Sequence, residues 1–280
     1  MKTLITGANG QLGLELGKIM SGAVLAGHND LDITDKNAVD TFVKKNNIDT
    51  IINCAAYTAV DMAEDNYNLA EKINAVGPKH LADTGCKLVH ISTDYVFDGN
   101  ATEPYTIDCS PKPKSAYGKT KYLGEWVVQF CAKEYVIIRT SWLYSPYGKN
   151  FVKTMRNLAS NRKEISVVSD QFGLPTYAAD LANAIMQMLP QINKKNSGVY
   201  HYSNSSETNG ISWYDFAVEI MKQSGLDCMV KPITTAEYPT RAVRPKYSVL
   251  DTHEIQKIFG IKIPMWQDAL KRCINELERQ

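Results

Sequence analysis

Tyr117 and Lys121 are the first residues of this sequence whose types and spacing suggest chemistry. They stand four positions apart in a stretch with the pattern of a helix, and side chains at that spacing share one helical face. An ammonium beside a phenol favours the phenolate, so Lys121 could lower the pKa of Tyr117 and prepare it for proton transfer. Such pairs also arise by chance on exposed helices, so the interpretation depends on the neighbouring motifs.

Two further motifs follow apolar runs that predict buried strands. Ser92-Thr93-Asp94 ends one of these runs, and Asn53-Cys54-Ala55-Ala56 ends the run before it. Open α/β sheets place their sites beyond the carboxyl ends of the strands. A hydroxyl and a carboxyl are therefore expected at the same sheet edge as small residues beside which a cofactor could lie close.

A glycine-rich turn stands between the first predicted strand and the first predicted helix. Its sequence, Gly7-Ala8-Asn9-Gly10-Gln11-Leu12-Gly13, has the spacing GxxGxxG. Glycines allow a sharp turn and a close backbone approach, and the helix that follows offers free N–H groups to a pyrophosphate. A tight turn without a ligand is the alternative, but the order of all these motifs along the chain favours a dinucleotide site.

An acidic pair follows the second predicted strand, slightly beyond the distance at which dinucleotide sites hold the adenosine ribose. Asp30 and Asp32 could take that role, and Asp32-Ile33 could instead flank the adenine. A solvated turn with a helix-capping Asp explains the same residues equally well. Since no Arg stands nearby to hold a 2′-phosphate, these residues leave NAD and NADP open.

The elements that would position these groups alternate between strands and helices. Continuous Val/Ile/Leu runs predict strands buried on both faces, and helical stretches between them predict βαβ units with a parallel sheet. The predicted strands are residues 3–6, 23–26, 50–54, 88–92 and 136–140, and amphipathic stretches between them include 12–20 and 66–83. The expected fold class is α/β, with a Rossmann-type, doubly wound parallel sheet.

The sequence predicts a turn at residues 145–148, and the regular alternation of apolar runs and helical patterns changes after it. We expect residues 1–145 to form the dinucleotide-binding domain and residues 146–280 to form a smaller, interleaved substrate-binding domain. A helix pattern and a strand pattern within the second part indicate that about 176–204 returns to the first sheet. Other patterns there predict a short strand near 165–168 and helices near 213–223 and 266–277.

The composition is that of an ordinary globular chain of 280 residues, with 44% hydrophobic and 22% charged residues. This excludes an intrinsically disordered chain, and a net charge of +1 provides no global field for nucleic acid or an acidic membrane. No apolar stretch reaches the length of a bilayer span, and the first ten residues lack the apolar core of a signal peptide. We therefore expect a cytoplasmic protein without nucleic-acid or membrane partners.

The six cysteines and five histidines do not form metal-ligand patterns. No two cysteines have CxxC spacing, most lie in or beside apolar runs, and the histidines are scattered. Buried free thiols and structural or exposed imidazoles are the simplest interpretation. We expect no required metal.

These motifs in their order resemble the extended short-chain dehydrogenase/reductases, and within them the dTDP-4-dehydrorhamnose reductases. The resemblance covers nearly the whole chain, and STDYVFDG, YGKTK and RPKYSVLD in that order are typical of this branch. The matching segments are ITGANGQLG (5–13), NCAAYTAVDMAE (53–64), INAVGPKHLA (73–82), ISTDYVFDG (91–99), YGKTKYLGE (117–125), RTSWLY (139–144), DQFGLPTYAADLA (170–182) and RAVRPKYSVLD (241–251).

The resemblance implies reduction of the C4 ketone of dTDP-4-dehydro-L-rhamnose to dTDP-L-rhamnose, the last step of dTDP-rhamnose synthesis. NADPH, or alternatively NADH, would supply the hydride. Tyr117 would give a proton to the C4 oxygen, Lys121 would bind the nicotinamide ribose and tune Tyr117, and Thr93 would hydrogen-bond the reacting oxygen. The cofactor would also lie against Gly10, Gln11 and Leu12 at the pyrophosphate, Asp32 and Ile33 at the adenosine, and Ala55, Ala56 and Tyr57 along its length.

On the substrate side, the resemblance implies that Asp94 holds sugar hydroxyls and that Trp142 faces the nucleotide sugar. A Trp at a strand end is often partly buried in the core, which is the alternative for Trp142. Arg241 and Arg244 could clamp the diphosphate, because guanidinium groups suit phosphate oxygens. A solvated basic turn would explain these two arginines as well.

One feature departs from the family. Some members join two subunits through a magnesium ion held by glutamates. Glu15 matches one of those positions and Glu276 is a candidate for another, but the third position is Ala179. We therefore expect no metal-bridged dimer, while a homodimer through other contacts stays open.

Two other functions remain open at the level of sequence. One is another nucleotide-sugar enzyme of the same fold, either a different 4-ketoreductase or a 4-epimerase. The other is a non-catalytic regulatory subunit that keeps the glycine-rich turn. The complete set of Thr93, Tyr117 and Lys121 argues against the regulatory subunit, because a pure binding protein needs no poised acid.

Overall fold

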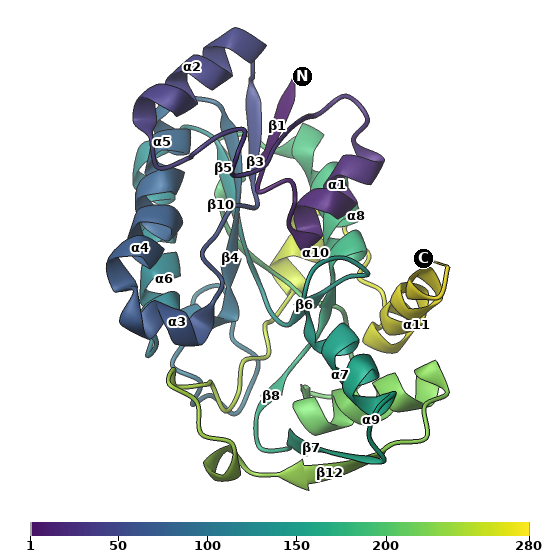
Figure 1. Ribbon diagram of the computed structural model, residues 1–280. Coiled ribbons are helices and arrows are strands. Elements are labelled where there is room, and N and C mark those ends of the chain that lie inside the picture. The colour runs from purple at the N-terminus through teal and green to yellow at the C-terminus, as the bar shows by residue number, and fades with distance from the viewer. Residues whose placement is uncertain (1, 280) are drawn as a thin grey trace.

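The computed structural model describes residues 2–279, and its centre is one parallel sheet (Figure 1). The strand order is β10-β5-β4-β3-β1-β2. The strands are β1 (Thr3–Thr6), β2 (Val24–Ala26), β3 (Thr50–Asn53), β4 (Lys87–Thr93), β5 (Tyr135–Thr140) and β10 (Gly198–Tyr202). From β1 the chain moves first to one side, to β2, and then to the other, to β3, so the crevice between the carboxyl ends of β1 and β3 is the expected ligand site. The predicted α/β Rossmann-type class is confirmed.

Helices cover both faces of the sheet, which explains why its strands are apolar on both sides (Figure 1). One face carries α2 (Lys36–Asn46), α3 (Val60–Asp65), α4 (Tyr67–Glu71), α5 (Gly77–Asp83) and α6 (Ala116–Cys131). The other carries α1 (Gln11–Ile19), α8 (Ala178–Met188) and α10 (His253–Phe259). Among residues 2–279, none of the helices combines the length and apolar character that a membrane crossing requires.

The amphipathic stretch predicted over residues 66–83 is helical but not one regular helix. Between α4 and α5 lies the π-helical segment η1 (Lys72–Val76). Pro78 has no N–H to give to the carbonyl of Asn74, so the regular ladder cannot continue there. That carbonyl instead faces α6, where Gly124 is needed because a Cβ would overlap it.

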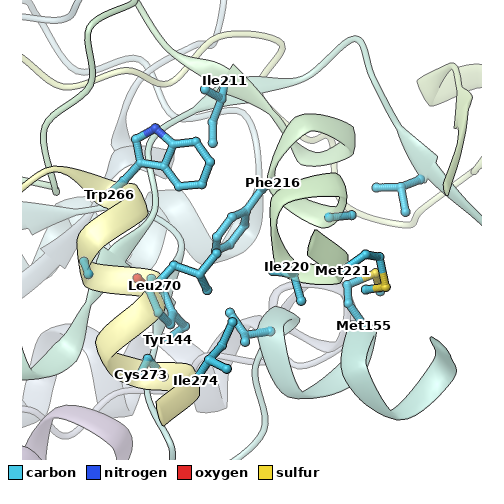
Figure 2. Close-up of a cluster of buried hydrophobic side chains, with 14 of the residues drawn as sticks. Tyr144, Met155, Ile211, Phe216, Ile220, Met221, Trp266, Leu270, Cys273 and Ile274 are labelled. Carbon is cyan, nitrogen blue, oxygen red and sulfur yellow. The ribbon is translucent and has the colours of Figure 1, made fainter. Parts of the chain in front are cut away.

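A second group of elements packs around its own core below the sheet in Figure 1. Helices α7 (Phe151–Ala159), α9 (Trp213–Ser224) and α11 (Trp266–Leu277) surround Phe216, as Figure 2 shows. Three short pairs of strands complete it: β7 (Glu164–Val168) with β12 (Met229–Ile233), β8 (Phe172–Gly173) with β11 (Ile211–Ser212), and β6 (Leu143–Tyr144) with β9 (Thr176–Tyr177). Between these elements the chain runs back through α8, which packs on α1, to β10 at the edge of the large sheet.

All six cysteines are free thiols, three of them buried and three partly buried. Burial raises the pKa of Cys54 to about 12 and that of Cys273 likewise to about 12. These thiols therefore stay protonated at neutral pH and act as small apolar side chains.

Candidate active site

The glycine-rich turn after β1 has the geometry of a phosphate loop. Gly7 has φ +63°, and a Cβ on it would lie 2.6 Å from the backbone nitrogen of Ala55, so only glycine fits. Helix α1 begins at Gln11 with Gly10 as its N-cap, and no side chain caps it. The first N–H groups of the helix and the positive end of its dipole are therefore offered to an anion.

Contacts on two sides hold this turn in place. A Cβ on Gly13 would lie 2.6 Å from Cα of Ala8, so the helix can approach the turn only with glycine there. Leu12 is buried in the core between the sheet and α8. The amide oxygen of Gln11 accepts a hydrogen bond from Nδ2 of Asn150 at 2.9 Å, which ties the turn to the segment after β6.

Asp32 and Ile33, the predicted adenosine-side residues, differ in their surroundings. The exposed carboxylate of Asp32 accepts from the hydroxyl and the backbone N–H of Thr34, at 2.7 and 2.8 Å, and these bonds hold the pKa of Asp32 below its ordinary value. Ile33 is buried against Gly77, where a Cβ would lie 2.6 Å from its Cδ1. The acid that caps α2 is Asp35, so Asp32 shapes its own turn and Ile33 provides a fixed apolar wall.

The stretch Ala55-Ala56-Tyr57 leaves the end of β3 beside the phosphate loop. Asn53, the last residue of β3, accepts through Oδ1 from the N–H of Ala55 at 3.2 Å and from the hydroxyl of Thr6 at 2.7 Å. All three residues of the stretch are partly exposed. The structure thus brings together the small residues and the glycine turn that the sequence placed far apart.

Asn74, which sequence reasoning did not single out, connects this stretch to α6. Its buried side chain accepts from the N–H of Tyr57 at 2.8 Å and donates to the carbonyl of Tyr57 at 3.1 Å. The same amide donates to the hydroxyl of Thr120 on α6 at 3.0 Å. Asn74 therefore fixes the spacing between the cofactor stretch and the helix that carries Tyr117 and Lys121.

Tyr117, Lys121 and Thr93 meet at the carboxyl end of β4. Tyr117 and Lys121 lie in the first two turns of α6, whose N-cap is Ser115. Lys121 is buried, and its ammonium donates to the backbone carbonyl of Ile91 at 2.6 Å. Thr93 is the last residue of β4, and its side chain is within hydrogen-bonding reach of the Tyr117 hydroxyl.

Burial decides the protonation of these groups. It raises the pKa of Tyr117 above the ordinary value, although the hydrogen bond with Thr93 opposes this, and it lowers the pKa of Lys121 to about 8. The sequence predicted the opposite direction for Tyr117; here burial sets the direction, and the ammonium of Lys121 is bound to the carbonyl of Ile91. Tyr117 therefore carries its proton at neutral pH, which suits a proton donor.

Asp94 begins the short helix η2 (Asp94–Val96) directly after Thr93. Its buried Oδ1 accepts from the hydroxyl of Thr93 at 3.0 Å, while Oδ2 has no hydrogen bond of ordinary geometry among residues 2–279. Burial raises the pKa of Asp94 to about 6, although the hydroxyls of Ser248 and Thr93 oppose this. A buried carboxylate oxygen in this condition is suited to accept a ligand hydroxyl.

Trp142 stands after β5 in a left-handed backbone conformation, with φ +47°. Its ring stacks on Trp213 of α9, with centroids 3.5 Å apart and planes at 12°. A Cβ on Gly173 would lie 2.7 Å from the Trp142 ring, so the indole is packed on a second side. Trp142 is partly buried and joins the large sheet to the second core.

Arg241 and Arg244 lie in the loop after η4 (Thr235–Glu237), and both face carboxylates of α3. Arg241 pairs with Asp65. Arg244 pairs with Asp61 through Nη2, and its Nη1 donates to the hydroxyl of Tyr95 at 3.0 Å. The two arginines thus bridge to α3, Arg241 as an exposed pair with Asp65 and Arg244 as a more buried pair with Asp61.

The residues around Glu15 do not form a divalent-metal site. Lys18 places its ammonium 3.5 Å from Glu15 and in contact with Glu276, which also accepts from the hydroxyl of Tyr177 at 2.9 Å. The third family position is Ala179, which has no ligand atom in its side chain, and residues 2–279 contain no group of three acidic, His or Cys ligands suited to a metal. In this arrangement the ammonium of Lys18 supplies the positive charge beside the two carboxylates.

The acids of α3 are further residues that sequence reasoning missed. Asp61 and Glu64 belong to the segment VDMAED, directly after the predicted cofactor stretch. Glu64 accepts from the backbone N–H of Ala116, the first residue of α6, at 2.9 Å. Three acids within six residues beside a predicted cofactor stretch were a signal that these side chains have partners.

Comparison with known proteins covers the whole molecule. The family model described as RmlD substrate binding domain matches residues 1–279. The spore coat polysaccharide biosynthesis protein SpsK of Bacillus subtilis (strain 168) is 42% identical over 284 residues, which cover 98% of this chain and 97% of SpsK.

Two solved structures share the fold in full. A dTDP-4-dehydrorhamnose reductase from Clostridium acetobutylicum ATCC 824 has 46% identity and a TM-score of 0.94, and the match covers 99% of this chain and 100% of that one. A dTDP-4-dehydrorhamnose reductase from Bacillus anthracis str. Ames, in complex with NADP, has 41% identity and a TM-score of 0.92, with 98% and 99% covered.

Proposed function

Because this chain belongs to the RmlD family, we propose that it reduces the C4 ketone of dTDP-4-dehydro-L-rhamnose to dTDP-L-rhamnose with NADPH. It is an oxidoreductase acting on a nucleotide sugar. The observation that carries the proposal is the meeting of Thr93, Tyr117 and Lys121 at one sheet edge beside an uncapped, glycine-bounded helix start. Full-length relatives at 41–46% identity are named as reductases of this substrate.

The residues of the phosphate loop fit a dinucleotide. Gly7 lets the turn pack directly on the backbone of Ala55, and the uncapped amides at the start of α1 would bind the pyrophosphate. Asp32 and Ile33 would lie at the adenosine end, with Ala55, Ala56 and Tyr57 along the nicotinamide half. When bound there, NADPH supplies the hydride for C4. The relative from Bacillus anthracis that contains NADP supports this assignment.

Tyr117 is the proposed proton donor. It holds its proton at neutral pH because burial raises its pKa, and it releases the proton only as the C4 oxygen gains negative charge. Thr93 hydrogen-bonds the same oxygen and stabilises that charge. Lys121, with a pKa of about 8, is mostly charged at pH 7 and offsets the phenolate that remains, while its position in α6 suits contact with the cofactor ribose.

On the substrate side, Asp94 and Trp142 are the proposed sugar contacts. Asp94 would accept a sugar hydroxyl at Oδ2, which has no hydrogen bond of ordinary geometry among residues 2–279, and the stacked Trp142 ring would lie beside the sugar. For the diphosphate, Arg241 is better placed than Arg244, because Arg241 is exposed and its pair with Asp65 is open to solvent. Arg244 is largely buried between two partners and is the less available anion ligand.

The proposal includes no metal, nucleic acid or membrane. All the proposed site residues come from a single chain, so a homodimer is compatible with the activity but not needed for it. We further propose a cytoplasmic location, because all six cysteines are free, as is usual for proteins of reducing compartments.

The test follows the oxidation of NADPH and NADH by the purified protein with dTDP-4-dehydro-L-rhamnose. We expect turnover by the wild type, formation of dTDP-L-rhamnose, and loss of turnover in Tyr117→Phe. Absence of turnover, or full activity of Tyr117→Phe, would overturn the proposal.

Two outcomes of the same experiment would favour the alternatives. A 4-epimerase retains and regenerates its NAD, so a protein that purifies with stoichiometric NAD and ignores added NADPH would belong to that class. A regulatory subunit would bind NADPH and co-purify with a synthetase without turning over any keto sugar.

A further inference from the structure

Helix α3 (Val60–Asp65) lies between the catalytic helix and the loop after η4 and uses each of its three acids for a separate long-range contact. Glu64 accepts from the N–H of Ala116 at the start of α6. Asp61 accepts from the N–H of Ala242 at 3.0 Å and pairs with Arg244. The cofactor stretch, the catalytic helix and the loop are therefore joined through six residues.

Arg244 uses its planar fork to hold two groups at once. Nη2 pairs with Asp61 and Nη1 donates to the hydroxyl of Tyr95 at 3.0 Å. The guanidinium carbon lies 6.0 Å from the centre of the Tyr95 ring, and the side chain is 19% exposed. Both bonds need the geometry of guanidinium, which a lysine ammonium does not reproduce.

Tyr95 in turn lies against the proposed proton donor. Its ring meets Tyr117 edge to face, with centroids 5.6 Å apart and planes at 74°. Its backbone N–H donates to the hydroxyl of Thr93 at 3.2 Å, and its carbonyl is so close to Gly118 that a Cβ there would overlap it. One residue thus touches both side chains that would contact the reacting oxygen.

We propose that Asp61 is a positioning residue of the reduction: through Arg244 it fixes the ring of Tyr95 and thereby the orientation of Tyr117. This inference rests on the proposed function. Without the Asp61 carboxylate, the guanidinium of Arg244 loses the partner that orients it. Its hydrogen bond to the hydroxyl of Tyr95 is then no longer held in place. Because misplacement by about 1 Å can cost a hundredfold in rate, the effect falls on kcat.

The charges of Asp61 and Arg244 act on Tyr95 and not directly on Tyr117. Burial raises the pKa of Tyr95 to about 12, and the charge of Arg244 opposes this rise while that of Asp61 adds to it. The groups that act on the pKa of Tyr117 are Thr93, Asp94 and Tyr95. The loss of Asp61 should therefore reach Tyr117 through the position of the Tyr95 ring, and its signature is a fall in kcat with an unchanged KM for NADPH.

The experiment measures kcat and KM for the wild type, Asp61→Asn and Asp65→Asn with NADPH and dTDP-4-dehydro-L-rhamnose. Asp65 is the matched control, since it lies in the same helix and pairs with Arg241, an arginine of the same loop. For Asp61→Asn we expect a fall in kcat of about tenfold to a hundredfold and an unchanged KM for NADPH. For Asp65→Asn we expect the kcat of the wild type.

Arg244→Lys provides a second variant in case Asp61→Asn folds poorly. It keeps the positive charge near Asp61 but cannot bond Asp61 and Tyr95 together, so kcat should fall while the circular dichroism spectrum and KM for NADPH stay unchanged. Folded Asp61→Asn and Arg244→Lys with wild-type kcat would overturn the inference, as would equal losses in Asp61→Asn and Asp65→Asn. An inactive wild type would instead overturn the proposed function, and the inference with it.

Discussion

Glu125 and Arg139 form a buried, bidentate ion pair near the proposed catalytic residues Tyr117 and Lys121. Nε of Arg139 donates to Oε1 at 2.9 Å and Nη2 donates to Oε2 at 2.7 Å. The hydroxyl of Ser92 also donates to Oε1, at 2.6 Å. The pair therefore joins α6 to β4 and β5 one helical turn after Lys121, and it helps to hold α6 in place on the sheet.

Replacing Glu125 by Gln should destabilise the protein, because Arg139 would keep a buried charge without its partner. We expect the free energy of unfolding, measured by urea denaturation, to fall by about 3–5 kcal/mol. The control is Asp40→Asn in the exposed Lys36–Asp40 pair, which should leave the urea midpoint unchanged. A loss below about 1 kcal/mol for Glu125→Gln would mean that Ser92 and the remaining amide replace the carboxylate.

Gly13→Ala should weaken NADPH binding without abolishing the fold. A Cβ there meets Cα of Ala8, so α1 must move away from the turn that forms the phosphate loop. We expect the dissociation constant for NADPH, from fluorescence titration, to rise at least about tenfold. Gly22→Ala is the control, since a Cβ at Gly22 has no atom within 4 Å, and equal affinities for the two variants would contradict the loop's role.

Tyr117→Phe should remove the proton donor and leave the cofactor site intact. The expected loss in kcat is about a hundredfold or more, with an NADPH dissociation constant near that of the wild type. Tyr122→Phe, a change of the same kind on α6 at a residue that packs against a separate apolar cluster, should keep full activity. Similar rates for the two variants would exclude Tyr117 as the acid.

Protonation of Asp94 should lower kcat/KM for the sugar nucleotide at acid pH, which gives the pH profile an acid limb. Its pKa is raised to about 6, so its carboxylate gains a proton, and its ability to accept a sugar hydroxyl falls, as the pH drops through that value. We expect kcat/KM for the sugar nucleotide to decline below about pH 6 in the wild type. Asp94→Asn should have a lower kcat/KM and lack this limb, and a limb that persists in the variant would belong to another group.

The same shift has a consequence for stability with a definite sign. Between the ordinary pKa of 3.8 and about 6 the folded state binds more protons than the unfolded state, so stability falls as pH rises through this window. Above about pH 6 Asp94 is charged in both states, and the burial of its charge lowers the free energy of unfolding by a constant amount. Asp94→Asn should therefore have a higher Tm than the wild type near pH 7 and lose that advantage near pH 4.

Chelation should leave the wild type unchanged, because the ammonium of Lys18 lies between Glu15 and Glu276. We expect the same Tm and activity with EDTA as with Mg²⁺. Lys18→Met should lower the Tm, since the two carboxylates would then lack a counter-charge, whereas Lys257→Met in an exposed pair should not. A wild-type Tm that falls with EDTA would show that a metal contributes after all.

The predicted strands and the helices that follow them correspond closely to the observed elements. Residues 3–6 and 213–223 were predicted from continuous apolar runs and from helical periodicity, and β1 and α9 occupy nearly the same positions. The π-helical segment Lys72–Val76 was not predicted, because it depends on Pro78 and on the close approach of α6 at Gly124. Helical periodicity alone cannot show where a ladder changes its spacing.

The motifs of the site were visible in the sequence, but several of their contacts were not. The order of the glycine turn, the strand ends and Tyr117 indicated a dinucleotide site, since each motif is defined within a few residues. The direction of the Tyr117 pKa was predicted wrongly, because helical spacing reveals the neighbour Lys121 but neither the burial of Tyr117 nor the carbonyl of Ile91 that binds Lys121.

By itself, the sequence determined the order of strands and helices, the glycine-rich turn after the first strand and the types of residue at the strand ends. These are local properties, set by hydrophobic periodicity and by the steric limits of the backbone. Only the tertiary structure decided which charges meet: Arg244 pairs with Asp61 across 183 residues, and Lys18 with Glu276 across 258. Such pairs depend on how whole elements pack against one another, and no spacing along the chain encodes that.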